Sequence, residues 1–215
     1  MKGLLIKDLK LMKNQRGFLI LFLAVGITIF INNPDFALGY LTFIGAMFSM
    51  SSISYDEFEN GNAFLFSLPI TRKGYVKEKY VFTFLASIFS WLVAVSIAGI
   101  QMRCKNQTIG QEWFLSAVLI FTIFMLFLLV MLPLHLKFGG EKVKIVIIMI
   151  AGIVVLTVVN GMKIVNKNGI DLLEVLNRVG QFKVGTVLLL ALAVAGIAFI
   201  FSFQISVRIV ERKEF

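Results

Sequence analysis

WFLSAVLIFTIFMLFLLVMLPLHL, residues 113–136, is a run of 24 residues without aspartate, glutamate, lysine or arginine. A helix of about 20 apolar residues is long enough to cross the hydrocarbon core of a membrane. The run is continuous in Leu, Ile, Val, Phe and Ala and does not alternate apolar with polar residues, which is the pattern of a barrel strand. The stretch therefore predicts an α-helical membrane protein.

Five further segments lack charged residues in the same way. They are Gly17–Ile31, Phe36–Ile53, Tyr80–Met102, Ile145–Val159 and Val184–Val207. Of the 215 residues 59% are hydrophobic and only 15% are charged, so six crossings leave room for short loops but not for a soluble domain. We predict an all-α membrane protein, a single domain over residues 1–215 with six transmembrane helices. The first and fifth segments are short, so flanking residues must complete those two crossings.

Basic residues are distributed unequally between the two sides of the predicted membrane. Fifteen of the 21 lysines and arginines fall on the side that carries both termini, and six fall on the other. The positive-inside rule therefore places both termini in the cytoplasm. The net charge of +9 is explained by contact with lipid head groups, and we expect no nucleic-acid partner.

Two segments outside the spans have helical patterns of their own. Residues 1–16 place Leu5, Leu9 and Met12 on one stripe with lysines on the other side, which predicts an amphipathic interfacial helix. Residues 160–183 form the predicted extracellular loop, and an apolar stripe from Leu172 to Val179 predicts a short helix in it.

The largest predicted cytoplasmic loop covers residues 54–79. It begins with an acidic cluster around Asp56 and continues with apolar residues up to Pro69. The residue before a proline is biased away from the helical conformation, so a short helix should end near Ser67. Thr71 then suits the N-cap of a new helix that runs into the third span. The loop should fold as helix, break, helix.

The motifs of an enzyme are missing from the chain. The sequence contains no phosphate-binding loop of the form GxxxxGK[ST], so we expect this chain to bind no ATP. His135 is the only histidine and Cys104 the only cysteine, and we expect no catalytic residue, no cofactor and no metal site. The six segments also lack the ionisable pairs that proton- or sodium-coupled carriers place at mid-membrane.

A membrane protein with no energy source of its own can work if a partner moves it. Phe64, Leu65 and Leu68 form an apolar knob that could fill a groove on a cytoplasmic protein, with Glu57 and Arg72 as polar contacts. The alternative is that the knob folds back onto the membrane surface.

The segment EFENGNAFLFSLPITRKGYVKEK, residues 57–79, resembles the first cytoplasmic loop of permeases of type-2 ABC exporters. In that family an acidic residue, a glycine, a short apolar helix, a Leu-Pro pair, an apolar residue, Ser or Thr, Arg and a later Lys recur in this order. The amino-terminal MKGLLIKDLKLMKNQ also resembles the start of the family, an interfacial helix before the first of six spans. The short loop resembles that of small Gram-positive bacterial permeases that export peptides, toxins or antimicrobial compounds, which implies a place in the plasma membrane of a bacterial cell.

The resemblance implies a permease subunit whose partners are separate ABC ATPase subunits, which bind ATP and Mg, and a second permease in a homodimer or heterodimer. It also implies that the loop carries a coupling helix that docks into the ATPase. The residues that would dock are Glu57, Glu59, Gly61, Phe64, Leu65, Leu68, Pro69 and Arg72.

Two functions remain open at this point. One is the export of an amphipathic or apolar substrate, since the spans supply Phe, Leu, Met and Gly but no charges. The alternative is a scaffold, sensor or immunity subunit of the membrane that moves nothing. Co-purification of an ATPase would separate the two.

Overall fold

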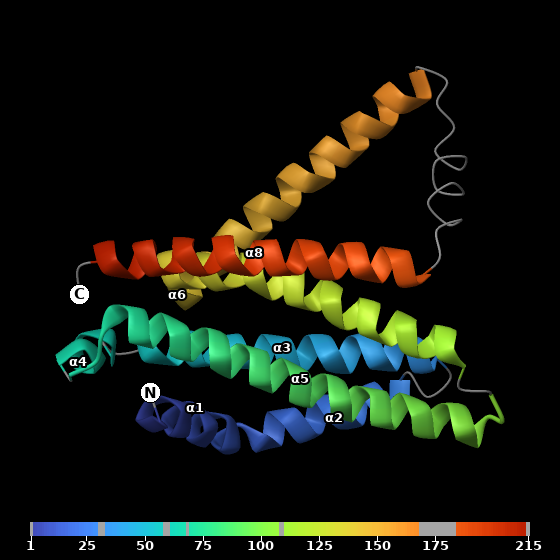
Figure 1. Cartoon of the computed structure of the whole chain (residues 1–215), viewed down its shortest axis with the longest axis horizontal. Helices are drawn as coiled ribbons and strands as arrows, with labels where there is room; N and C mark the ends of the chain where they lie inside the picture. Colours follow the sequence, from blue (N-terminus) through green and yellow to red (C-terminus); the bar gives the residue numbers. More distant parts are fainter. Residues whose placement is uncertain are drawn as a thin grey trace.

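The computed structural model describes residues 2–29, 33–57, 61–67, 69–107, 110–167 and 184–213, and every regular element within these ranges is a helix. The helices, labelled as in Figure 1, are α1 (Lys2–Asn14), α2 (Arg16–Ile29), α3 (Pro34–Glu57), α4 (Gly61–Ser67), α5 (Arg72–Cys104), α6 (Gln111–Lys167) and α8 (Val184–Arg212). The all-α prediction is confirmed for this part of the chain.

Local sequence signals set the helix ends around α4 and α5. Thr71 has an extended backbone, and its Oγ1 accepts a hydrogen bond of 3.1 Å from the Gly74 amide, so it is the N-cap of α5. At the other end of α5, Asn106 takes a left-handed conformation (φ 55°), and the Gln107 amide donates to the Met102 carbonyl at 3.0 Å. This is a Schellman C-cap. The predicted end of the short helix at Ser67 and the predicted N-cap at Thr71 are both confirmed.

Among the described residues, four helices are long and apolar enough to cross a membrane. They are α3, α5, the part of α6 from Gln111 to Gly140, and Gly185–Arg212 of α8. The apolar part of α2, Arg16–Thr28, is shorter, and the predicted fifth span, 145–159, lies in the second half of α6. Six crossings therefore stay a prediction. The predicted extracellular loop begins inside α6, and its proposed helix at 172–179 lies outside the described residues.

The helix α6 changes direction at Gly139, whose φ of 78° and ψ of 169° are not helical. Figure 1 shows the second half of α6 leaning away from the bundle formed by the other long helices. Glycine is needed at this position because its backbone is left-handed and because a Cβ would lie 2.3 Å from a carboxylate oxygen of Glu57. The predicted loop between the fourth and fifth spans is thus a single break in one helix.

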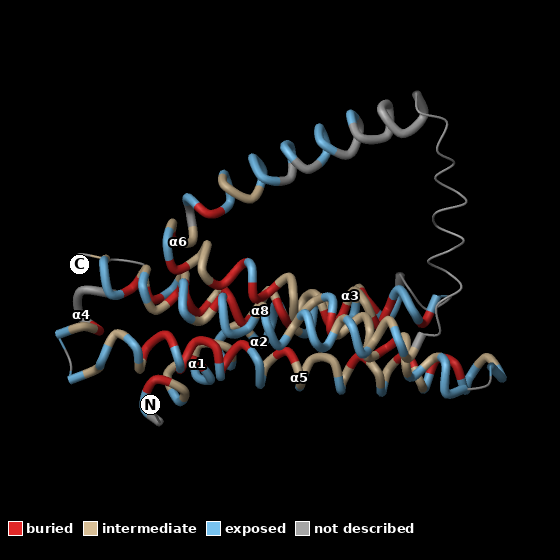
Figure 2. Tube along the Cα trace, turned by 45° about the horizontal axis from the view of Figure 1, so that its top comes forward, coloured by how far each residue is buried: buried red, intermediate tan, exposed pale blue. Residues whose placement is uncertain are grey.

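Within the bundle, α3 packs along α5 and α6, and α8 packs along α6 and α5. Half of the apolar window of α3 is buried, against 6% for α8, so α3 is the central helix and α8 is peripheral. Exposed residues recur along the long helices (Figure 2), and many of them are large and apolar, among them Phe89, Ile148 and Leu189. Such a surface is stable in lipid and not in water.

The helices α3 and α5 approach each other closely at Gly45 and Ser90. A Cβ at Gly45 would lie 1.9 Å from the Ser90 hydroxyl, which donates a 2.9 Å hydrogen bond to the Leu41 carbonyl. Small residues at such crossings let the two backbones pack closely and share polar contacts.

We predict that Gly45→Ala destabilises the chain by about 1–3 kcal/mol, because the new methyl group overpacks the crossing. Gly39→Ala on the same helix is the matched control, since nothing lies within 4 Å of a Cβ there. Thermal unfolding in mild detergent measures both variants. Equal midpoints for the two would show that α3 and α5 do not pack as described.

Candidate functional site: a buried charge cluster beside α4

One end of the bundle gathers α4, the N-terminal end of α5 and the C-terminal end of α8, together with the N and C marks of the chain (Figure 1). We call it the loop end. Both termini thus lie at the same end, as the sequence predicts, while their placement in the cytoplasm stays a prediction. The helices α3 and α5 extend beyond the charge-free segments, so the predicted loop 54–79 is mostly helical.

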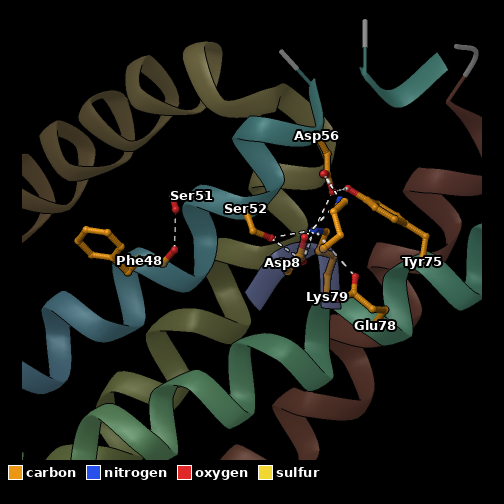
Figure 3. Close-up of polar contacts among 9 residues, drawn as sticks. Asp8, Phe48, Ser51, Ser52, Asp56, Tyr75, Glu78 and Lys79 are labelled. Carbon is orange, nitrogen blue, oxygen red and sulfur yellow. Dashed lines mark hydrogen bonds and ion pairs between the residues drawn. The ribbon is translucent and has the colours of Figure 1, made fainter. Parts of the chain in front are cut away.

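Lys79 is the centre of a cluster of charged and polar side chains at the loop end (Figure 3). Its ammonium is fully buried and lies 2.6 Å from Asp8 Oδ2, 2.7 Å from Asp56 Oδ2 and 2.7 Å from Ser52 Oγ. These partners come from α1 and α3, whereas Lys79 is on α5. A single side chain therefore joins three helices.

Further contacts complete the network. Lys7 forms an ion pair with Asp56, and its Nζ also lies 3.2 Å from Asp8 Oδ1. The Ser52 hydroxyl donates to Asp8 Oδ2 at 2.9 Å, and the Tyr75 hydroxyl donates to Asp56 Oδ2 at 3.1 Å. With Glu78, whose Oε2 lies 3.9 Å from Lys79 Nζ, these residues form what we call the charge cluster. Its members are Lys7, Asp8, Ser52, Asp56, Tyr75, Glu78 and Lys79.

The two members of the charge cluster on α1 are held ionised by their partners. Burial raises the pKa of the Asp8 carboxyl, but Lys79, Lys7 and the Ser52 hydroxyl together lower it further, so the pKa lies below the ordinary value. Burial lowers the pKa of the Lys7 ammonium, but the hydrogen bonds and negative charges of Asp56 and Asp8 together raise it further, so the pKa lies above the ordinary value. At neutral pH, α1 therefore presents opposite charges to α3 and α5.

The charge cluster is not electrically balanced. Ionised throughout, it would contain three carboxylates and two ammonium groups, and it is almost entirely buried. Both carboxyl oxygens of Glu78 and Oδ1 of Asp8 have no hydrogen-bond partner among the described residues. An uncompensated buried charge is costly, so Glu78 is the weakest member of the cluster.

The short helix α4 packs directly beside this cluster. Leu65 is buried in the main apolar core, and the Phe66 ring contacts the Tyr75 ring edge to face, with centroids 5.5 Å apart. At the start of α4, a Cβ on Gly61 would lie 2.7 Å from the Asp56 carbonyl oxygen. Two neighbours of α4, Asp56 and Tyr75, thus belong to the charge cluster.

Two further polar contacts tie the loop end to α6 and α8. Glu57 Oε2 accepts a 2.9 Å hydrogen bond from the Gly140 amide, and its Oε1 lies 2.9 Å from Lys213 Nζ. Arg72 Nη1 donates to the carbonyls of Val210 (3.2 Å) and Glu211 at the C-terminal end of α8. A cation at a helix C-terminus is favourable because the last carbonyls carry partial negative charge.

The predicted docking residues occupy different environments. Glu57 and Arg72 bind groups of their own chain, Leu65 is buried, Gly61 touches the end of α3, and Pro69 is exposed. Phe64 belongs to α4 but its side chain is not described, and Glu59 and Leu68 lie outside the described residues. Docking by these residues stays a prediction.

The charge cluster itself was not predicted. The predicted stripe of α1 was Leu5, Leu9 and Met12, but the residues of α1 that are buried are Leu4 and Asp8, and Leu9 is 59% exposed. The sequence does contain a signal for this buried face of α1, because Asp8 lies four residues after Leu4 and therefore on the same side of the helix.

An apolar cavity of about 670 Å³ lies between α5, α6 and α8. Trp91, Phe121, Met125 and Phe199 are among its lining residues, and no lining residue is charged. The Tyr80 hydroxyl bonds to Ser202 (2.6 Å) and Ser206 (2.8 Å), whereas the hydroxyl of Thr83, which also lines the cavity, has no hydrogen-bond partner among the described residues. The cavity suits an apolar guest.

We predict that Lys79→Met destabilises the chain by about 3–5 kcal/mol, because Asp8 and Asp56 lose the cation that compensates them. Glu78→Gln should be neutral or stabilising, because it removes a buried charge that lies 3.9 Å from Lys79 Nζ and accepts no hydrogen bond from a described residue. Lys77→Met, an exposed position on the same helix, is the control. Thermal unfolding in detergent compares the three, and a Lys79→Met midpoint equal to that of Lys77→Met would contradict a structural role for the cluster.

Comparison with known proteins gives one result that covers the chain. Residues 3–211 match the family model described as ABC-2 family transporter protein. No curated protein and no solved structure matches the chain. With nearly all of its length inside this match, the chain belongs to the ABC-2 transporter family and is a membrane permease component of an ABC transporter.

Proposed function

We propose that the chain is the permease subunit of an ATP-driven exporter in a bacterial plasma membrane. Separate ATPase subunits bind ATP and Mg, and α4 receives their movement. The charge cluster passes the movement to α1, α3 and α5. The observation that carries this proposal is the position of α4, which touches both Tyr75 and the end of α3 in a chain that has no ATP-binding motif.

The geometry supports transmission rather than a loose linker. A displacement of Phe66 moves the Tyr75 ring, and the Tyr75 hydroxyl holds Asp56, which in turn holds Lys79. Close-packed interiors and hydrogen-bonded networks move as units because their members have few alternative arrangements. Glu57 and Arg72 connect the loop end to α6 and α8 through further hydrogen bonds.

The substrate class follows from the cavity. A space of about 670 Å³ with aromatic and aliphatic walls and no charge would accept the apolar face of an amphipathic peptide, toxin or antimicrobial compound. A second permease, identical or related, would cover part of the exposed apolar surface of α8 and of the second half of α6.

We predict that the chain, purified in mild detergent from its native cells, brings an ABC ATPase with it, and that Phe64→Asp retains less than about a tenth of that ATPase. A charge in an apolar docking helix must be desolvated when the partner binds. Quantitative mass spectrometry of the purified complex measures the ratio. Gln111→Asp, exposed on the helix end opposite the loop end, is the control and should keep the ATPase.

Two outcomes would count against docking through α4. If Phe64→Asp brings as much ATPase as the unchanged chain, docking does not use α4. If the unchanged chain brings no ATPase at all, the scaffold, sensor or immunity alternative is favoured.

We further predict that Tyr75→Phe keeps the ATPase bound but uncouples it, because the ring still contacts Phe66 while the hydrogen bond to Asp56 is lost. ATP hydrolysis per complex should remain, and the protection of expressing cells against amphipathic antimicrobial peptides should fall several-fold. Trp113→Phe removes a comparable hydrogen bond, 3.0 Å to Asp35, at the other end of the bundle and should change neither reading. Unchanged protection in Tyr75→Phe would exclude the charge cluster from coupling.

A further inference from the structure

A second apolar depression lies on the outside of the bundle, between α5 and α8. It has a volume of about 510 Å³, and its walls include Val81, Phe84, Leu85 and Phe203. Val81, Phe84 and Leu85 are 37%, 47% and 56% exposed, so these walls face the surroundings and not the interior. We call it the lateral groove.

One end of the lateral groove carries two positive charges. Lys73 and Lys77 line it, and no acidic residue does. The two lysines are four residues apart on α5 and therefore lie one above the other on the same face. Both are exposed, and neither ammonium has an ion pair or hydrogen bond with a described residue. By contrast, Lys79 on the same helix is fully buried and paired.

The order of these residues along α5 gives the groove a polar end and an apolar end. From Lys77 to Leu85 the helix advances about 12 Å at 1.5 Å per residue. Over this distance the lining changes from two ammonium groups to aromatic and aliphatic side chains. A free anion would contact only the lysine end of the groove, and an apolar molecule would contact only its aromatic and aliphatic end.

We propose that the lateral groove binds one anionic phospholipid. Its phosphate lies between Lys73 and Lys77, and one acyl chain lies along Phe84 and Leu85. The phosphate is negative and the two lysine ammonium groups are positive, so they attract each other. Each methylene group of the acyl chain that is buried against the groove wall adds apolar contact. Lipid binding requires no transport step, so this proposal does not depend on whether the chain exports a substrate.

A second copy of the chain is a poorer occupant. Two-fold contacts place the same surface patch of both copies face to face. Over the lateral groove this would bring the Lys73 and Lys77 pairs of two copies together, in a chain whose net charge is already +9. Like charges in contact are unfavourable, whereas a phosphate neutralises them.

A lipid bound here would also contact residues that line the apolar cavity between α5, α6 and α8. Tyr80, Phe84 and Phe199 line both the lateral groove and that cavity. Tyr80 is held by Ser202 and Ser206 of α8 and lies edge to face with Phe199. A lipid in the groove therefore braces the contact between α5 and α8, and binding to the folded state stabilises it by mass action.

The test uses the full chain in detergent and native mass spectrometry with added lipids of identical acyl chains. We expect phosphatidylglycerol to remain bound in preference to phosphatidylcholine and to raise the thermal midpoint. The double variant Lys73→Gln/Lys77→Gln should weaken phosphatidylglycerol binding about thirty-fold, as two basic side chains each contribute about 1 kcal/mol. Lys142→Gln/Lys144→Gln removes the same charge from exposed positions on α6 and should keep the affinity.

A second variant and a head-group probe separate the alternatives. Leu85→Glu places an acid on the exposed wall and should abolish the lipid preference without unfolding the chain, which circular dichroism checks. Four outcomes would overturn the proposal: equal binding of the two lipids, equal losses in the two double variants, full competition by glycerol phosphate alone, or a dimer that buries Leu85.

Discussion

The burial of the Lys79 ammonium is the constraint on which the loop end depends. Removing an ion from water costs several kcal/mol even after the protein relaxes, so a fully buried lysine requires carboxylates at contact distance. The chain supplies them from two other helices, Asp8 on α1 and Asp56 on α3. The amino-terminal helix is therefore part of the bundle through an ion pair, in addition to any contact that its exposed apolar residues make with lipid.

The polar contacts at the loop end connect five of the seven described helices. The charge cluster joins α1, α3 and α5, Glu57 joins α3 to the break in α6 and to Lys213 after α8, and Arg72 joins α5 to the end of α8. In the middle of the bundle the described contacts are mainly apolar, around Leu128, Leu132 and Tyr80. Apolar packing is non-directional, whereas ion pairs and hydrogen bonds fix particular atoms to one another. The loop end is thus the part of the chain whose geometry is most narrowly specified.

Local signals in the sequence predicted much of the fold, and distant pairings could not be predicted. The all-α class, the end of α4 at Ser67 and the N-cap at Thr71 depend on neighbouring residues and are confirmed for the described residues, while six crossings stay a prediction. Lys79 was counted among the basic residues that face lipid head groups, because a charge count treats every lysine alike. Its burial depends on residues 71 and 23 positions earlier, Asp8 and Asp56, and the local pattern around Lys79 carries no sign of such distant partners. The break at Gly139 was predicted as a loop, because consecutive glycines indicate a change of direction but not its length.

Glu57 shows how the predicted docking loop and the spans are related. The resemblance to exporter permeases suggested a contact with the ATPase, yet its carboxylate binds the Gly140 amide and Lys213. Gly139 tolerates no side chain next to that carboxylate, so the position of Glu57 and the angle between the two halves of α6 are set together. Because Glu57 is the last residue of α3, four residues before α4 begins, a shift of α4 in our proposal acts on this angle as well as on Tyr75. In this proposal Glu57 takes part in coupling through contacts within its own chain, and it does not need to contact the ATPase.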